Sequence, residues 1–173
     1  MAQDLTNKKH FVVETSDIKA TRAGHIYSVK DTSNNMDNGE LVLIDKLIKG
    51  ENEVFSVKTP AETDKGVVLI NTPALIYDTA TTLRGAEYRF YNEAGSVARA
   101  YELVAGDRFG VSKEAITALS GEVVVDNYVV CDGAKKYKEK ASVEGTEGFV
   151  AQIMFTKTFG NGDTRVYLRV VQN

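Results

Sequence analysis

The chain has 173 residues, of which 43% are hydrophobic and 26% are charged, values that are ordinary for a soluble globular protein and exclude wholesale disorder. Its 21 Lys and Arg residues against 24 Asp and Glu residues give a net charge of −3, which argues against a general nucleic-acid-binding protein. The single cysteine excludes an internal disulfide and a zinc site built from cysteines.

The first nine residues are polar, and we expect them to form a mobile arm that carries Lys8 and Lys9. They contain no apolar core of a secretory signal, and no stretch of the chain approaches the roughly 20 apolar residues of a membrane span. We therefore expect a soluble protein that is made in the cytoplasm and does not contact a membrane.

In the first half of the chain, short apolar runs alternate with residues typical of turns, which predicts β-strands. The loop 31–39 is dense in Asn, Asp, Ser and Gly, which bond their own backbone or accept a positive φ. Residues 40–45 are almost continuously apolar, as in a strand buried on both faces. The strands expected here are 11–14, 25–29, 40–45, 53–58 and 66–70.

The second half repeats this alternation and differs at one place. Where the first half has its Asn-rich loop, residues 112–119 show the best helical pattern in the chain, with Ser112 as the N-cap. Asp-Gly at 132–133 and Asn-Gly at 161–162 are hairpin signals. The strands expected here are 97–103, 108–111, 122–126, 128–131, 135–140, 149–156 and 165–171.

An offset of 82 residues relates the two halves. Ten of the 48 residues from 23 to 70 are identical to the residue 82 positions later, against roughly three expected from average residue usage. The sequence therefore predicts a mainly β fold of two tandem related antiparallel units, 10–82 and 83–173, each a small barrel or sandwich, with one short helix near 112–119. Units this small are expected to pack together, because each buries barely enough surface to fold alone.

No pattern of catalytic or metal-binding residues is found. His10 and His25 are the only histidines, and neither has a His, Cys or acid at ligand spacing in the sequence. The glycine-rich stretch 160–163 lacks the Lys of a phosphate-binding loop, which favours a hairpin turn. Cys131 lies in an apolar run, which predicts a buried, unreactive thiol. We assign no catalytic, cofactor-binding or metal-binding residues and expect no enzyme.

Two polar segments are candidates for contact with another molecule. Residues 135–140 form the only basic cluster, which suits a solvated edge strand or an acidic protein surface. A groove for single-stranded nucleic acid would need several stacking rings on a basic face. The Asn-rich loop is the second segment. The candidate contact residues are Lys8, Lys9, Asn34, Asn35, Lys135, Lys136 and Lys138.

Three segments of the chain resemble a known group of viral proteins. They are Tyr91–Gly95, Arg99–Leu103 and Gly106–Ala115. Over roughly residues 75–130 the chain is similar to small proteins encoded beside the major capsid protein in tailed bacteriophages, which are regarded as capsid decoration, cement or head-fibre components. The resemblance implies a structural virion protein without a catalytic signature, and it assigns no functional residues.

The resemblance implies a protein that binds the outer surface of an icosahedral phage capsid and stabilises it, and the predicted β scaffold with exposed loops agrees with this. Its expected partners are the major capsid protein and further copies of itself on the capsid, with no nucleic acid, membrane or cofactor. The alternative is a carbohydrate- or host-surface-binding β module displayed on a particle, with Tyr77, Tyr88 and Tyr91 stacking on sugars, although the lack of Trp counts against it. A deep pocket lined by convergent acids and His25 would favour a third hypothesis, an enzyme.

Overall fold

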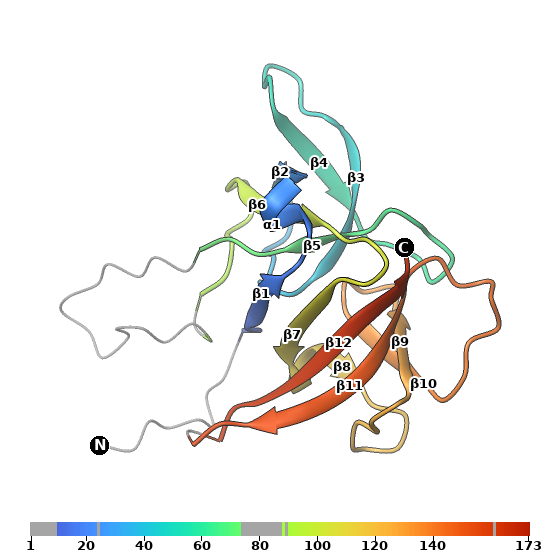
Figure 1. The fold of residues 1–173 in the computed structure, drawn as a ribbon. Helices are drawn as coiled ribbons and strands as arrows, with labels where there is room; N and C mark the ends of the chain where they lie inside the picture. Colours follow the sequence, from blue (N-terminus) through green and yellow to red (C-terminus); the bar gives the residue numbers. More distant parts are fainter. Residues whose placement is uncertain (1–9, 24, 74–87, 89, 161) are drawn as a thin grey trace.

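The computed structural model describes residues 10–173 except 24, 74–87, 89 and 161 (Figure 1). Its described strands form two sheets, one of them a closed barrel, so the predicted mainly β fold is confirmed. Figure 1 shows the barrel above the second sheet, with the C-terminus between them and the β3–β4 hairpin projecting from the barrel. The predicted N-terminal arm lies outside the described residues.

The barrel contains five strands. They are β2 (Ile26–Lys30), β3 (Leu41–Leu47), β4 (Val54–Lys58), β5 (Val68–Ile70) and β6 (Ala98–Glu102). The order around the barrel is β2-β4-β3-β5-β6, and all neighbours are antiparallel except β2 and β4. Because β6 closes the barrel, the predicted boundary between 10–82 and 83–173 does not coincide with the division between the sheets.

The second sheet contains seven strands. They are β1 (Val13–Asp17), β7 (Arg108–Ser112), β8 (Ile116–Thr117), β9 (Tyr128–Cys131), β10 (Tyr137–Lys140), β11 (Val150–Thr158) and β12 (Thr164–Gln172). Their order is β1-β7-β12-β11-β9-β10-β8, and only β8 and β10 are parallel. The 3-10 helix η3 (Lys113–Ala115) joins β7 to β8, and the short helix α1 (Ala20–Ala23) lies between β1 and β2.

The barrel and the second sheet, called the first and second units from here on, share one pairing pattern. In the barrel β2 pairs with β6 and, in parallel, with β4; in the second sheet β7 pairs with β12, and its continuation β8 pairs in parallel with β10. β3 bridges β4 and β5 as β9 bridges β10 and β11, and β5 pairs with β6 as β11 pairs with β12. The offset of 82 carries β2 onto β7, since 26–30 becomes 108–112. The same offset carries β4 onto β10 and β5 onto the start of β11, but it does not relate β6 to β12.

The predicted helix 112–119 is wrong beyond its first turn, and the predicted strand 122–126 is a loop. Ser112 does not cap a helix, because its hydroxyl exchanges hydrogen bonds with the backbone of Val12 (2.9 and 3.3 Å). Ile116 pairs with Tyr137 in β10 instead of continuing a helix. A tertiary contact thus competes with the local helical preference and prevails.

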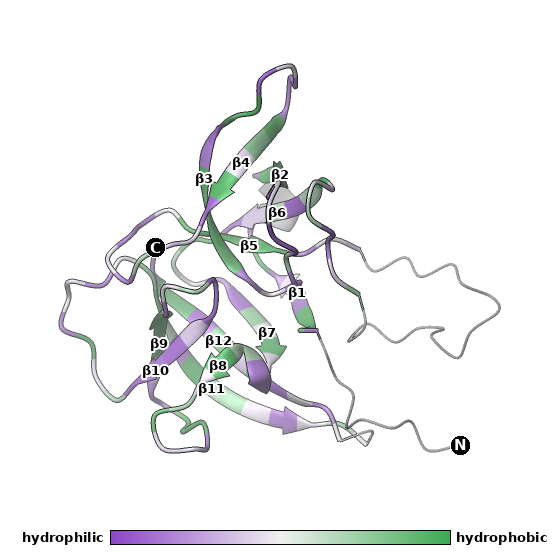
Figure 2. Cartoon of the chain, turned by 180° about the vertical axis from the view of Figure 1, so that it is seen from behind, coloured by the Kyte–Doolittle hydropathy of each residue, from purple (hydrophilic) through white to green (hydrophobic). Residues whose placement is uncertain are grey.

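Two apolar cores meet at β5. The smaller core lies inside the barrel and consists of Val29, Met36, Val42, Val68, Ile70, Ala98 and Ala100. The larger core fills the second unit and includes Leu41, Leu69, Tyr101 and Leu103 from the barrel. Successive residues of β5 therefore belong alternately to the two cores, and all three are buried, in agreement with the hydrophobic colour of this strand in Figure 2. Cys131 is buried as predicted, and burial raises the pKa of its thiol to about 12.

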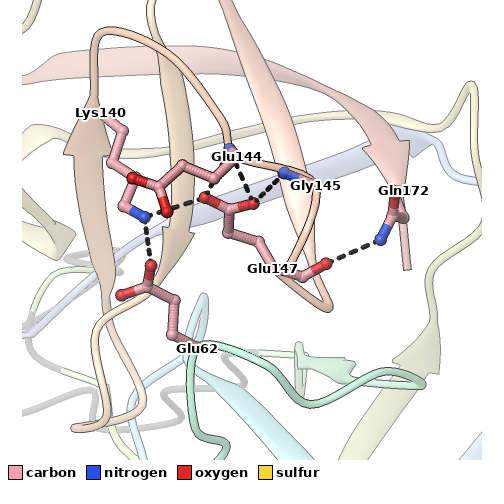
Figure 3. A network of polar contacts seen from close by, with 6 residues as sticks. All are labelled: Glu62, Lys140, Glu144, Gly145, Glu147 and Gln172. Atoms are coloured by element: carbon pink, nitrogen blue, oxygen red, sulfur yellow. Dashed lines mark hydrogen bonds and ion pairs between the residues drawn. The ribbon is translucent and has the colours of Figure 1, made fainter.

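A polar network fastens the two units beside these cores (Figure 3). Lys140 on β10 bonds to Glu62 of the first unit and to Glu147 at 2.9 Å. The Glu147 carboxylate also accepts the backbone N–H groups of Glu144 (3.1 Å) and Gly145 (2.8 Å). The hydrogen bond from Lys140, followed by those from the backbone, lowers the pKa of Glu147 to about 2, so this buried carboxylate remains ionised.

We predict that Gly148→Ala destabilises this junction. The Gly148 N–H donates to the Glu62 carbonyl at 2.9 Å, and an added Cβ would lie 1.8 Å from the carbonyl oxygen of Asp64. Because backbone would have to move, the free energy of unfolding should fall by about 2–3 kcal/mol, measured by chemical denaturation. Gly160→Ala is the control, since no atom lies within 4 Å of its Cβ position. Equal stability of the two variants would contradict the tight junction.

Candidate functional site

Three loops meet at one end of the molecule and form what we call the loop surface, residues 31–39, 91–96 and 132–136. Met36 and Asn92 exchange two backbone hydrogen bonds of 2.9 and 2.8 Å, which joins the first two loops. The Lys135 ammonium donates to Asp31 at 2.7 Å, which joins the first loop to the third, and the Lys135 carbonyl accepts the N–H of Leu41, the first residue of β3, at 2.9 Å. The structure therefore brings together the Asn-rich loop and the start of the lysine cluster, two segments about 100 residues apart.

Asp31 connects all three loops. Its Oδ1 accepts the N–H groups of Ser33 (2.9 Å) and Asn34 (3.0 Å), and its Oδ2 accepts the Lys135 ammonium at 2.7 Å. Its carbonyl accepts the Gly95 N–H at 2.7 Å. Burial raises the pKa of Asp31, but the hydrogen bonds from Lys135 and the two N–H groups outweigh it and lower the pKa to about 2. The ion pair is therefore present throughout the physiological pH range.

The predicted contact residues differ in their availability on this surface. Lys135 is buried and its ammonium is bonded to Asp31, so it is a structural residue and is not available for a partner. Asn34 and Asn35 are exposed, and the Asn35 side-chain oxygen accepts the Ala94 N–H at 2.9 Å. The Asn-rich loop is thus held in place by its own side chains.

Lys136 lies just before β10, and Lys138 lies on it. Lys136 is half-buried, with its ammonium 5.0 Å above the centre of the Phe11 ring. Lys138 is exposed. Lys8 and Lys9 lie outside the described residues. Of the predicted set, Asn34, Asn35, Lys136 and Lys138 are the described residues that present surface to a partner.

Two asparagines of this region were not identified from the sequence. The Asn38 side chain donates to the Thr72 carbonyl at 2.7 Å and accepts the Thr72 N–H at 2.9 Å. The Asn92 side chain donates to the Met36 carbonyl at 3.0 Å. Both side chains are buried, and their amide groups form hydrogen bonds with the backbone of neighbouring loops. Their partners are 34 and 56 residues away, so no local pattern identifies them.

His10, the first described residue, lies at the same end. Its Nδ1 is 2.6 Å from Asp37 Oδ1, and its ring stacks on Tyr91 with centroids 4.6 Å apart. Its N–H donates to the Tyr88 carbonyl at 3.0 Å. One face of the Tyr91 ring is therefore covered, which limits its use as a sugar platform, and Tyr77 lies outside the described residues.

Glu40 lies behind the loop surface, between the two units. Its Oε2 is the one buried side-chain oxygen or nitrogen without a hydrogen bond in the described part of the chain. Burial raises the pKa of Glu40 to about 7, with Lys135 and Lys136 opposing the rise and Asp37 adding to it. The carboxyl therefore changes charge near neutral pH, at the point where the two units meet.

An open groove of about 560 Å³ runs between the units and is lined by Tyr27, Glu102 and Gln172 among others. Glu102 Oε2 is 2.5 Å from His25 Nδ1 and 3.4 Å from the Tyr27 hydroxyl. Burial, followed by the Glu102 carboxylate, raises the pKa of Tyr27. The groove offers a ring and a carboxylate, which are groups that can bind hydroxyls, and the carboxylate also contacts the exposed imidazole of His25, which is not part of the groove lining. Among the described residues that line the groove, Glu102 is the one acid, whereas the enzyme hypothesis requires convergent acids together with His25.

We predict that Glu40→Gln changes how stability depends on pH. A carboxyl group with a pKa raised from 4.5 to about 7 stabilises the fold below pH 4.5, and this contribution is lost as the pH rises through 7. Glu40→Gln should therefore raise the free energy of unfolding by about 1–3 kcal/mol at pH 8 and change it little at pH 4.5. Denaturation at both pH values measures this. Glu53→Gln, a change at an exposed acid, is the control and should change neither value. Parallel pH profiles for wild type and Glu40→Gln would contradict the assignment.

The described residues contain no group of three or more His, Cys, Asp or Glu side chains that could hold a metal ion. Within the same residues, no helix is long and apolar enough to cross a membrane. The chain matches no protein-family model, no curated protein and no solved structure at a significant level.

Proposed function

We propose that the protein is a structural virion component that binds the outer surface of an icosahedral bacteriophage capsid and stabilises it. The loop surface is the observation that carries this proposal. Three loops distant in sequence are fixed to one another by the Asp31–Lys135 ion pair and by asparagine side chains, and they leave Asn34, Asn35 and Lys136 toward the outside. Such a surface is ordered before it binds, so little conformational entropy is lost on contact with a partner.

The resemblance to phage decoration proteins supports the same proposal. Its three segments correspond to the loop 91–95, to β6 and to the region of β7 and η3. These elements close the barrel and lead into the second sheet, so the resembling stretch is the structural link between the units. A protein that binds across capsid subunits stabilises the assembled shell by mass action, because the separated subunits do not present the composite site.

Cosedimentation with phage heads tests this proposal. Expanded heads of the phage that encodes this chain, freed of surface proteins, are mixed with the purified full chain and pelleted. We expect saturable binding to the heads and a higher temperature of head disruption. Lys136→Glu should weaken binding by roughly threefold or more, because it reverses a charge on the loop surface.

The matched control is Lys49→Glu, which makes the same charge reversal at an exposed position in the β3–β4 hairpin, between β3 and β4. It should bind like the wild type. Absence of binding by the wild-type protein to these heads would overturn the proposal. Equal weakening by both variants would show that binding depends on overall charge and would exclude the loop surface as the contact.

The groove between the units favours a second candidate, a carbohydrate-binding module. Tyr27 supplies an aromatic ring at the groove, and Glu102 with His25 supplies groups that hydrogen-bond to hydroxyls. These residues replace Tyr77, Tyr88 and Tyr91 as the proposed sugar contacts. Sugar sites in proteins commonly combine a ring face with a few placed polar groups, as ligand sites do in general.

A glycan array with the purified protein separates the two functions. A carbohydrate-binding module should give a saturable signal that Tyr27→Ala reduces at least about tenfold, since the stacking ring is removed. Leu47→Ala, a change at an exposed site on β3 outside the groove, should leave the signal intact. Failure of any glycan to bind, or insensitivity to Tyr27→Ala, would exclude this site.

A further inference from the structure

A row of polar side chains crosses the outer face of the second sheet. In the register of the strands, Gln152 on β11 lies opposite Tyr128 on β9 and opposite Arg169 on β12. Side chains directly opposite each other on neighbouring strands share one face of the sheet. The residues before and after Gln152 and Arg169 belong to the large core, so the row itself faces away from that core. Figure 1 shows the three strands beside one another.

The three side chains of this row are available to a ligand. Arg169 is exposed, and Tyr128 and Gln152 are half-buried. Among the described residues, none of the three side chains has an ion pair or a hydrogen bond. The next row on the same face differs, because the Tyr167 hydroxyl donates to Glu14 at 2.6 Å. The row at Arg169 therefore leaves a guanidinium, an amide and a phenol for another molecule.

The charge of Arg169 is not balanced within the sheet. The register of β7 and β12 places Arg169 opposite a second cation, Arg108. Like charges opposite each other on adjacent strands destabilise a sheet. Asp17, which lies opposite Arg108 on β1, pairs with the Arg108 guanidinium at 3.0 Å and offsets one of the two charges. An anion bound at Arg169 would offset the other and remove the repulsion.

Tyr128, Gln152 and Arg169 line an open hollow of about 480 Å³, and the turn 104–107 forms one side of it. The turn is attached to β12, because the Gly106 N–H donates to the Val170 carbonyl at 2.8 Å. A volume of this size lies within the range of sites for small organic ligands. Since hydrogen bonds hold both the turn and the strands, the hollow is formed before a ligand binds.

We propose that this hollow binds an acidic sugar, with the sugar carboxylate on Arg169. A planar guanidinium donates two parallel hydrogen bonds to a carboxylate, a match that a lysine does not provide. The Gln152 amide both donates and accepts, as sugar hydroxyls require, and Tyr128 supplies a ring face. Neighbouring strands lie about 4.8 Å apart, so the row spans about 10 Å and contacts the sugar ring as well as its charge.

The hollow and the groove at Tyr27 share Ala105 and Val171 in their linings but no polar side chain. The groove carries the Glu102 carboxylate, which would repel an acidic sugar, whereas the hollow carries a cation. The inference rests on neither of the functions proposed above.

An NMR titration of the full chain labelled with nitrogen-15 tests the site. The acidic probes are a tetrasaccharide of alternating glucuronic acid and N-acetylglucosamine, and sialyllactose. Their neutral counterparts are the carboxyl-reduced tetrasaccharide and lactose. At least one acidic probe should shift the amide signals of Tyr128, Gln152 and Arg169 saturably, with a Kd of roughly 1 mM or lower. Its neutral counterpart should bind at least about tenfold more weakly. Absence of saturable shifts with both acidic probes, or equal binding of the neutral counterpart, overturns the proposal.

Substitution of Arg169 tests how the carboxylate is held. Arg169→Gln should raise the Kd at least about tenfold, and Arg169→Lys about threefold or more, because the charge remains while the paired hydrogen bonds are lost. Arg99→Gln is the matched control, since Arg99 is exposed on β6 in the barrel and does not line the hollow. It should bind like the wild type, and circular dichroism checks that all variants are folded. The same loss of affinity in Arg99→Gln and Arg169→Gln would exclude the hollow as the site. Inorganic phosphate that binds as tightly as the acidic probe would overturn the assignment to acidic sugars.

Discussion

The rest of the structure depends on the burial of β5 on both of its faces. Leu69 packs into the large core of the second unit, while Val68 and Ile70 pack into the barrel. A three-residue strand with two buried faces cannot leave either core without exposing the other, so the two units form one cooperative body. The loop surface, the groove and the Glu40 carboxyl all lie along the junction that this strand creates.

Three hydrogen-bonded carboxylates hold the loops that connect this framework. Asp31, Glu139 and Glu147 each accept two or more hydrogen bonds from backbone N–H groups, which satisfies their charge and fixes a loop at the same time. Glu40 is different because one of its oxygens is buried without a partner. The first three residues therefore fix loops, and Glu40 is the one of the four whose pKa is raised to about 7.

The sequence predicts most strands, because apolar runs and turn residues are local patterns. Apolar runs bounded by turn residues locate β3, β9, β11 and β12, and an offset of 82 relates β2 to β7. Contacts between distant residues cannot be found in this way. Ser112 bonds to the backbone of Val12, 100 residues away, instead of capping the predicted helix. Lys135 is buried and paired with Asp31, 104 residues away. The sequence therefore predicts the candidate site as two separate segments. The contact between these segments in the fold shows which of the described lysines remain exposed.

The two copies of the repeat differ in the loop that follows their first strand, and this difference gives each unit its own surface. In the first unit the loop is tied by Asp31 and asparagines into a polar surface. In the second it is tied by Glu139 and presents Leu119 and Val124 to solvent. Because each loop is fixed by its own carboxylate, a substitution in one loop leaves the hydrogen bonds that hold the other loop unchanged.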